Sequence, residues 1–203
     1  MKTKRALVVI DVQRDFCPGG SLAVPEGDTI IPKINELLPK FDLVIFTKDW
    51  HPENHDGFAS MNPGKQPFDI FEGNVLWPDH CVQNTLGAEF HPSLDLSKCA
   101  KDFYIFKKGI KNRSPGYSAF ENTGLQKFLD KRKITELYIA GLATDYCVKE
   151  TAIDGAKLGY DVHVVREASK AISSDLSETT EQLKNAGVYY TNIWVIDHLL
   201  SLE

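Results

Sequence analysis

The sequence predicts an α/β protein with a mainly parallel β-sheet and helices on both faces of that sheet. Apolar runs of strand length alternate with helical patterns along almost the whole chain. This alternation is typical of parallel sheets whose strands are connected by helices. The 203 residues are 42% hydrophobic and 25% charged, a length and composition that suit one globular core. We therefore expect a single domain over residues 1–203.

Six apolar runs are the expected strands. Strands of a parallel sheet that is covered on both faces read as nearly continuous apolar runs, and Leu137–Ala140 is the clearest example. The last of the six runs is the weakest. The expected strands cover residues 6–12, 43–48, 103–107, 136–142, 162–166 and 189–195.

Helical patterns occupy most of the gaps between these runs. Thr144 and Asp145 are both residue types that favour the N-cap of a helix, so we expect Cys147 to lie in the first turn of a helix that opens at Asp145. Pro32 is tolerated only in the first turn of its helix. The other expected helices cover residues 29–38, 120–131 and 177–186.

Residues 50–99 interrupt the alternation. This segment contains no convincing long element and is rich in Pro, Gly, Asn and His. An irregular connection of this length inside a compact domain is usually a functional loop or a lid. We therefore expect residues 50–99 to form a loop region within the domain.

Charge and motif content exclude several classes of function. The formal net charge is -5, which provides no basic face for nucleic acid or for an anionic membrane. No apolar run is long enough to span a bilayer, and the basic start is not followed by a cleavage site. The four cysteines lack metal-finger spacing and are too few for a disulfide scaffold, so we expect free thiols in the cytoplasm.

Three polar residues stand at strand ends, where open α/β sheets place their chemistry. Asp11 ends the first run, Lys108 follows the third, and Cys147 follows the fourth. The positive end of a helix favours a thiolate, and a nearby lysine lowers the pKa of an acid. If the three strands are adjacent, these groups suit nucleophilic catalysis. The plainer interpretations are a capping carboxylate, a solvated lysine and a small buried cysteine.

A metal site is the second hypothesis. Asp49 and His51 are two positions apart at the end of the second run, so in an extended chain their side chains point the same way. The following loop offers His80 and, less clearly, His55. Two imidazoles and one carboxylate suit zinc, iron or manganese, although polar loops also carry histidines that bind nothing. The remaining histidines show no such grouping and are expected to be structural: His91, His163 and His198.

These motifs together resemble one family. Each motif is weak alone, but in this order, and over almost the whole chain, they resemble the nicotinamidases, which are isochorismatase-like cysteine hydrolases. Plain isochorismatases lack both the nucleophilic cysteine and the metal ligands. The segments that carry the resemblance are Ala6–Leu22, Asp49–Pro52, Trp77–Cys81, Lys108–Gly109, Tyr117–Phe120 and Gly141–Cys147.

The resemblance implies a fold and a catalytic set. The implied fold is a three-layer α/β/α domain with a six-stranded, mainly parallel sheet. Cys147 would be the nucleophile, Asp11 the base that takes its proton, and Lys108 the third member that holds the charges. The backbone N–H groups of Ala143 and Cys147 would form the oxyanion hole, and the Leu142–Ala143 peptide bond is expected to be cis.

The resemblance also implies a metal and a substrate pocket. One divalent ion, with zinc as the first choice and iron or manganese as alternatives, would be held by Asp49, His51 and His80. His55 is a candidate fourth ligand. The ion would bind the ring nitrogen of the substrate and so hold the carboxamide over the thiol. The walls of the pocket would be Phe16, Leu22, Trp77 and Tyr117.

The implied reaction is the hydrolysis of nicotinamide to nicotinate and ammonia through a cysteine thioester, a step of NAD salvage. Pyrazinamide is a candidate second substrate, and the chain is compatible with a homo-oligomer without indicating one. Three alternatives stay open at this point. They are another amidohydrolase of the superfamily with an N-carbamoyl or ureido substrate, a non-haem iron oxygenase, and a binding module that keeps the fold without catalysis.

Overall fold

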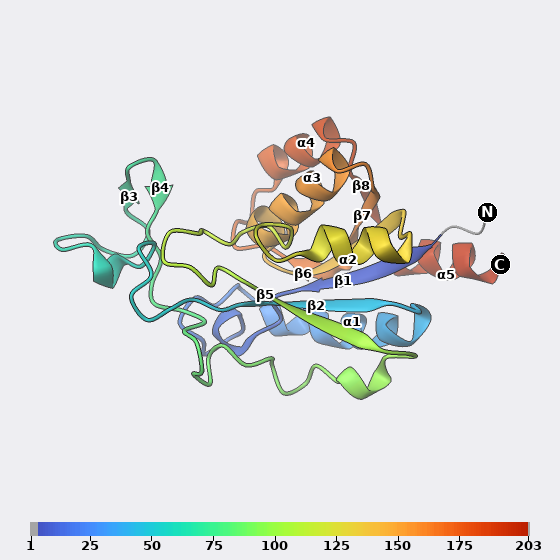
Figure 1. Ribbon diagram of the computed structural model, residues 1–203, viewed down its shortest axis with the longest axis horizontal. Coiled ribbons are helices and arrows are strands. Elements are labelled where there is room, and N and C mark those ends of the chain that lie inside the picture. The colour runs from blue at the N-terminus through green and yellow to red at the C-terminus, as the bar shows by residue number, and fades with distance from the viewer. Residues whose placement is uncertain (1–3, 203) are drawn as a thin grey trace.

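The computed structural model, which describes residues 4–202, contains a sheet of six strands that all run parallel. Their order across the sheet is β5-β2-β1-β6-β7-β8, so the predicted parallel sheet is confirmed (Figure 1). The strands are β1 (Arg5–Ile10), β2 (Val44–Asp49), β5 (Phe103–Lys108), β6 (Glu136–Leu142), β7 (Asp161–Lys170) and β8 (Tyr189–Thr191).

Helices cover both faces of the sheet, and alternate residues of each strand point into one layer or the other. Leu7 and Val9 of β1 belong to a core shared with α1 and α5, whereas Val8 belongs to a second core shared with α2, α3 and α4. The predicted three-layer arrangement is therefore confirmed. The helices are α1 (Ile31–Leu37), α2 (Leu125–Arg132), α3 (Lys149–Lys157), α4 (Ser177–Asn185) and α5 (Ile193–Ser201).

The prediction for the last strand is wrong beyond Thr191. Residues 189–195 were expected to be extended, but β8 has only three residues and the chain then enters α5. Asn192 is extended, and the N–H of Ile193 donates to the Glu167 carboxylate at 3.1 Å, which starts the helix. Ile193 and Ile196 are buried at helical spacing, a pattern that competes with the short apolar run for the same residues.

Two helix starts also differ from the predictions. Residues 120–124 form turns and α2 begins only at Leu125, after Gly124 with a φ of +80°. Before α3, residues Thr144–Val148 form a π-helical turn whose N-cap is Ala143, with no side-chain cap. The predicted N-cap role of Asp145 is wrong, because its carboxylate instead accepts hydrogen bonds from the N–H groups of Ile172 and Ser173.

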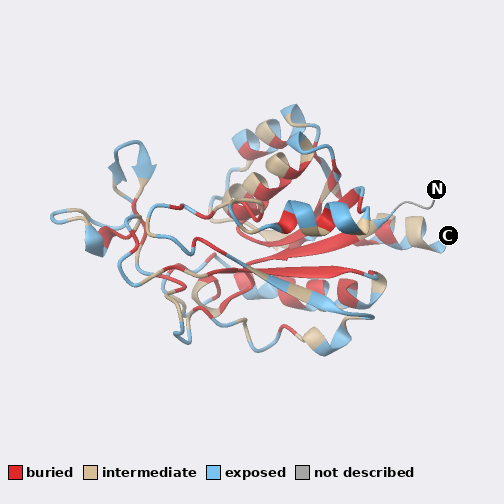
Figure 2. Ribbon diagram, in the orientation of Figure 1, coloured by how far each residue is buried: buried red, intermediate tan, exposed pale blue. Residues whose placement is uncertain are grey.

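Residues 50–99 contain no α-helix, and they include a two-stranded hairpin of β3 (Ile70–Phe71) and β4 (Asn74–Val75). The hairpin stands out at the end of the molecule opposite both termini (Figure 1), and its strands are largely exposed (Figure 2). Short 3-10 turns cover Arg14–Phe16, Gly27–Ile30, Leu38–Lys40, Ala59–Met61 and Leu96–Lys98. Within residues 4–202, no helix has the length and apolarity that crossing a membrane requires.

Candidate active site

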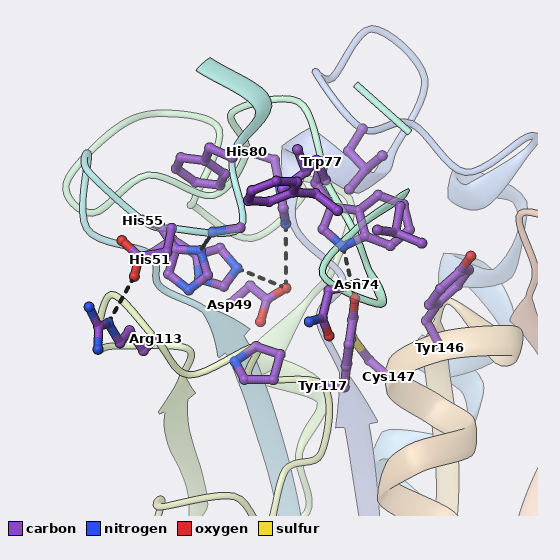
Figure 3. Close-up of a pocket in the computed structure, with 18 of the residues that line it drawn as sticks. Asp49, His51, His55, Asn74, Trp77, His80, Arg113, Tyr117, Tyr146 and Cys147 are labelled. Atoms are coloured by element: carbon purple, nitrogen blue, oxygen red, sulfur yellow. Dashed lines mark hydrogen bonds and ion pairs between the residues drawn. The ribbon is translucent and has the colours of Figure 1, made fainter. Parts of the chain in front are cut away.

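A cavity of about 530 Å³ lies where the carboxyl ends of the central strands meet the loop region. Cys147 lies at its edge with 7% of its surface exposed, and the cavity is drawn in Figure 3. Open α/β sheets bind ligands at this edge because the connections there can be shaped without disturbing the sheet. All four side chains predicted as walls line it: Phe16, Leu22, Trp77 and Tyr117.

A fully buried lysine, Lys108, joins the polar residues of the strand ends. Its Nζ lies 2.7 Å from the Asp11 carboxylate and donates to the Asp49 carboxylate. It also donates to the Gly116 carbonyl at 2.6 Å. An ammonium has three protons, and the Lys108 hydrogen bonds go to the Asp49 carboxylate, the Gly116 carbonyl and the Cys147 sulfur, while the Asp11 contact is an ion pair. The same Nζ lies 3.3 Å from Cys147 Sγ, so the predicted acid, cation and thiol do come together.

The way in which Lys108 reaches them differs from the expectation. The condition that the strands of Lys108 and Asp11 be adjacent is not met, because β2 lies between β5 and β1. Asp49 at the end of β2 is paired in register with Lys108, so the lysine side chain extends past Asp49 to Asp11. The metal-ligand candidate Asp49 is therefore also a charge partner of the catalytic candidates.

Burial and charge act differently on the two carboxyl groups. Burial raises the pKa of Asp11 to about 6, against the attraction of Lys108 and together with the repulsion of Asp49. For Asp49, burial also acts to raise the pKa, but Lys108 and His51 outweigh it and hold the pKa well below its usual range. A carboxyl group with a pKa raised in this way is suited to both accepting and donating a proton.

Cys147 is a neutral thiol in this arrangement. Burial raises the pKa of Cys147 well above its ordinary value, although Lys108 opposes this, and the Asp49 and Asp11 charges raise it further. A helix start favours a thiolate, but burial and the two nearby carboxylates outweigh that effect on the pKa of Cys147. Ionisation of this thiol would require a base, and Asp11, whose carboxylate lies within 4.8 Å of the Cys147 sulfur, is the candidate.

The turn before Cys147 is built for a close approach of two strands. Gly141 has a φ of +122°, and a Cβ there would overlap the backbone of Ile10 on β1. Only glycine tolerates both conditions. The Leu142–Ala143 peptide bond is cis, as predicted. The Ala143 carbonyl then accepts hydrogen bonds from the N–H groups of Tyr146 and Val148, which closes the turn that carries the cysteine.

Asp49, His51 and His80 form a group in which one ligand atom from each side chain lies within 4.8 Å of the others. Their dashed contacts converge in Figure 3. The Nδ1 of His51 lies 3.0 Å from the Gly109 carbonyl, and the Nδ1 of His80 lies 2.8 Å from the Pro78 carbonyl. These contacts favour the tautomer that presents a bare Nε2, as in metal-binding histidines.

Further details keep this group available for a cation. Burial and, to a smaller extent, the nearby His51 lower the pKa of His80 to about 4, so the His80 imidazole is neutral. Gly109 has a φ of +64°, and a Cβ at this position would overlap the His51 ring, so the glycine leaves room for it. Two imidazoles and one ionised carboxylate are a donor set that fits a divalent metal.

His55 stands next to this group without offering a free nitrogen. Its ring lies 4.4 Å from that of His51. Its Nε2 lies 2.9 Å from the Ser114 carbonyl, and its Nδ1 accepts from the N–H of Gly57 at 3.1 Å. Both nitrogens are thus engaged with backbone, which indicates a role in holding the loop. A role of His55 as a metal ligand stays a prediction that this geometry does not favour.

The aromatic walls are tied to one another. The Trp77 indole N–H donates to the Tyr117 hydroxyl at 2.9 Å, and burial raises the pKa of Tyr117 to about 12. Tyr146 packs edge-to-face on Trp77 with ring centroids 5.0 Å apart. Flat apolar walls of this kind suit a planar ring.

Several residues around the site escaped the sequence analysis. Tyr146 lies inside the motif of the cysteine but was not identified as a wall residue, and Ile172 also lines the cavity. The Thr47 hydroxyl donates to the Asp11 carboxylate at 2.6 Å, and Gln13 is fully buried beside Asp49. A polar residue inside an apolar run is a signal that could have identified Thr47, whereas Gln13 follows its run and carries no such signal.

Comparison with known proteins agrees with this geometry. The family model of the isochorismatase domain matches residues 5–193. The nicotinamidase of Acinetobacter baylyi is 46% identical over 195 residues, which cover 90% of this chain and 90% of that protein. The nicotinamidase of Escherichia coli is 42% identical over 183 residues, which cover 83% of this chain and 84% of that protein.

Solved structures give the same relationship. An Acinetobacter baumanii nicotinamidase and pyrazinamidase superposes with a TM-score of 0.88 at 42% identity, over 95% of this chain and 97% of that one. The pyrazinamidase of Pyrococcus horikoshii in complex with zinc superposes with a TM-score of 0.80 at 42% identity, over 93% of this chain and 99% of that chain. The chain therefore belongs to the isochorismatase family, in the branch that contains the nicotinamidases.

Proposed function

We propose that this chain hydrolyses nicotinamide to nicotinate and ammonia, and so returns the pyridine ring to NAD synthesis. The observation that carries the proposal is the buried contact of Lys108 with Asp11 and Cys147, at an aromatic cavity that also holds a metal-ligand group. The similarity to nicotinamidases over most of the chain supports the choice of substrate. Pyrazinamide presents the same carboxamide on a similar ring and is a second substrate of the same site.

Acylation begins with transfer of the Cys147 proton to the Asp11 carboxylate. The sulfur attacks the amide carbon, and a C–S bond forms while the carbonyl oxygen gains negative charge. The backbone N–H groups of Ala143 and Cys147 stabilise that oxyanion. Asp11 then gives its proton to the amide nitrogen, the C–N bond breaks, and ammonia leaves. Lys108 stays charged throughout and favours the carboxylate form of Asp11 before it takes the thiol proton and after it has given that proton to the leaving group.

Deacylation reverses the roles. Asp11 takes a proton from water, and the water oxygen attacks the thioester carbon. The C–S bond breaks, the sulfur leaves with the proton held by Asp11, and nicotinate is released. The two half-reactions together consume one water and one amide and yield one ammonia and one acid, with no change in oxidation state.

Asp49, His51 and His80 would hold a divalent ion, and we propose zinc. When bound, the ion supplies a Lewis-acid contact for the ring nitrogen. Trp77 and Tyr117 hold the ring between flat walls, and the cavity fixes the carboxamide against Cys147. Orientation of this kind lowers the barrier by removing freedom before the reaction. We propose that these three residues are the full set of protein ligands, because both nitrogens of His55 are engaged with backbone.

The direct assay is ammonia release from nicotinamide, pyrazinamide and an N-carbamoyl amine by the purified protein. We expect release from the two aromatic amides and none from the carbamoyl amine, because the walls and the metal group suit a ring with a nitrogen. Release from the carbamoyl amine alone would contradict the proposal and favour the ureido-type amidohydrolases of the same family.

Removal of the metal is expected to abolish nicotinamide hydrolysis, because the ring is then no longer held over the thiol. A loss of roughly 100-fold or more is the scale of a lost positioning contact. The protein is stripped with a chelator, its metal content is measured by elemental analysis, and activity is followed as zinc, iron or manganese is restored. Full activity in protein shown to be free of metal would remove Asp49, His51 and His80 from the mechanism.

The rate of nicotinamide hydrolysis is expected to fall in acid, with a midpoint at or below about pH 6. The active form of Asp11 is the carboxylate, and burial raises the pKa of this group to about 6. Activity should therefore be full well above that pH and be lost as pH falls through it. A cation bound beside Asp49 favours the carboxylate and moves the midpoint lower. A kcat/KM that increases as the pH is lowered from 7 to 5 would contradict the role of Asp11 as the base.

A further inference from the structure

The backbone ladder between β1 and β2 stops before it reaches the metal-ligand group. The last register pair of the two strands is Val9 with Phe46. Asp11 has a φ of +48°, a left-handed conformation that turns the chain out of the sheet. Its N–H then donates to the Thr47 hydroxyl rather than to a strand carbonyl. The backbone of Asp49 on the β1 side is thus left without a strand to pair with.

The side chain of Gln13 occupies that place. Gln13 is fully buried, and its Oε1 accepts from the Asp49 N–H at 2.8 Å. Its Nε2 donates to the Asp49 carbonyl at 2.8 Å and to the Ala88 carbonyl at 2.9 Å. The Gln13 amide therefore makes the hydrogen bonds to the Asp49 backbone that a longer β1 would make. Its hydrogen bond to Ala88 also connects Asp49 to the segment that follows His80.

We propose that Gln13 is a positioning residue of the metal site, which clamps the backbone of Asp49 and ties it to the loop of His80. The orientation of its amide is determined by its partners. A flipped amide would place its two protons against the Asp49 N–H and its oxygen against two carbonyl oxygens. The inference rests on the proposed function, because it requires that Asp49, His51 and His80 bind a divalent ion.

The clamp acts on the group whose geometry the site depends on most. Asp49 is almost fully buried and contacts Lys108 through one carboxylate oxygen, while its other oxygen lies 3.6 Å from His51 and 3.9 Å from His80. A small rotation of the Asp49 backbone would move both contacts. Groups that orient a metal ligand in this way typically change metal affinity or activity by about 10- to 100-fold when they are replaced.

The test compares two variants of similar size. Gln13→Met removes all three hydrogen bonds, and Gln13→Glu keeps the shape and the acceptor for the Asp49 N–H. Zinc affinity is measured by competition with a chelating dye, and thermal unfolding is measured with and without zinc. We expect zinc binding to weaken by about 10- to 100-fold, more in Gln13→Met than in Gln13→Glu, with hydrolysis of nicotinamide partly restored by excess zinc.

Asn35 provides a matched control, because its side-chain amide also bridges backbone groups, donating to the Ser93 carbonyl at 2.8 Å and accepting from the Asp95 N–H at 3.0 Å. Asn35→Leu and Asn35→Asp should leave zinc affinity unchanged. If Gln13 variants bind zinc as tightly as the parent protein and only unfold at a lower temperature, Gln13 is structural and the inference fails. If the parent protein itself binds no zinc, the metal site fails, and the Gln13 inference fails with it.

Discussion

Replacement of Cys147 by alanine is expected to reduce ammonia release from nicotinamide by roughly 10⁴-fold or more, the scale seen when a nucleophile is removed from a catalytic unit. The reason is that Cys147 is the only described thiol that lines the cavity, and its Sγ lies 3.3 Å from the Lys108 ammonium. The measurement is the steady-state rate of ammonia release, with folding checked by thermal unfolding. Substrate binding should persist, since the aromatic walls are untouched.

Cys99 is the matched control for this substitution. It is also a free cysteine, only partly buried, and it does not line the cavity. Cys99→Ala should keep a rate near that of the parent protein. A Cys147→Ala protein that hydrolyses nicotinamide at a rate comparable to that of the parent protein would rule out the thioester mechanism.

Replacement of Lys108 by methionine is expected to damage both activity and stability. The substitution leaves the buried carboxylates of Asp11 and Asp49 without their shared cation. Removing one partner of a buried ion pair costs about 3–5 kcal/mol in the free energy of unfolding. Activity should fall by roughly 100- to 10,000-fold, because Asp11 no longer stays ionised to act as a base. Both are measured by denaturant unfolding and by ammonia release.

Lys107 is the neighbouring control on the same strand. Its side chain is exposed and its Nζ lies 3.6 Å from the centre of the Trp50 ring, so it contacts neither carboxylate of the site. Lys107→Met should lose at most about 1 kcal/mol of a surface cation–π contact and retain activity. Equal effects of the two substitutions would mean that the charge of Lys108 has no special role.

Much of the fold was predictable because it depends on local pattern. The continuous apolar run Leu137–Ala140 indicates a strand that is covered on both faces of the sheet. The segment Glu136–Leu142 is such a strand, as predicted, and all of its residues are buried. The polar residues that end such runs must then gather at one edge of a parallel sheet. This is why Asp11, Lys108 and Cys147 could be proposed together before their contacts were known.

What was missed depends on contacts between distant segments. The placement of β2 between β5 and β1 decides that Lys108 reaches Asp11 past Asp49, and no local pattern encodes the strand order. Gln13 and Asp49 are 36 positions apart. A glutamine that follows a strand is as easily solvated as buried, so the sequence alone did not indicate that Gln13 contacts Asp49. The length of β8 was overestimated because its three residues and the start of α5 lie in one apolar stretch, which does not show where the strand ends.

The central claim is a covalent bond between Cys147 and the acyl group of the substrate, formed while Asp11 and Lys108 hold the charges. The most direct measurement is peptide mass spectrometry on protein quenched with acid during turnover of saturating nicotinamide. The account predicts a nicotinoyl group on the peptide that contains Cys147, absent from protein without substrate and from Cys147→Ala. Turnover that leaves the Cys147 peptide unmodified at every quench time, or an adduct on another residue, would contradict it.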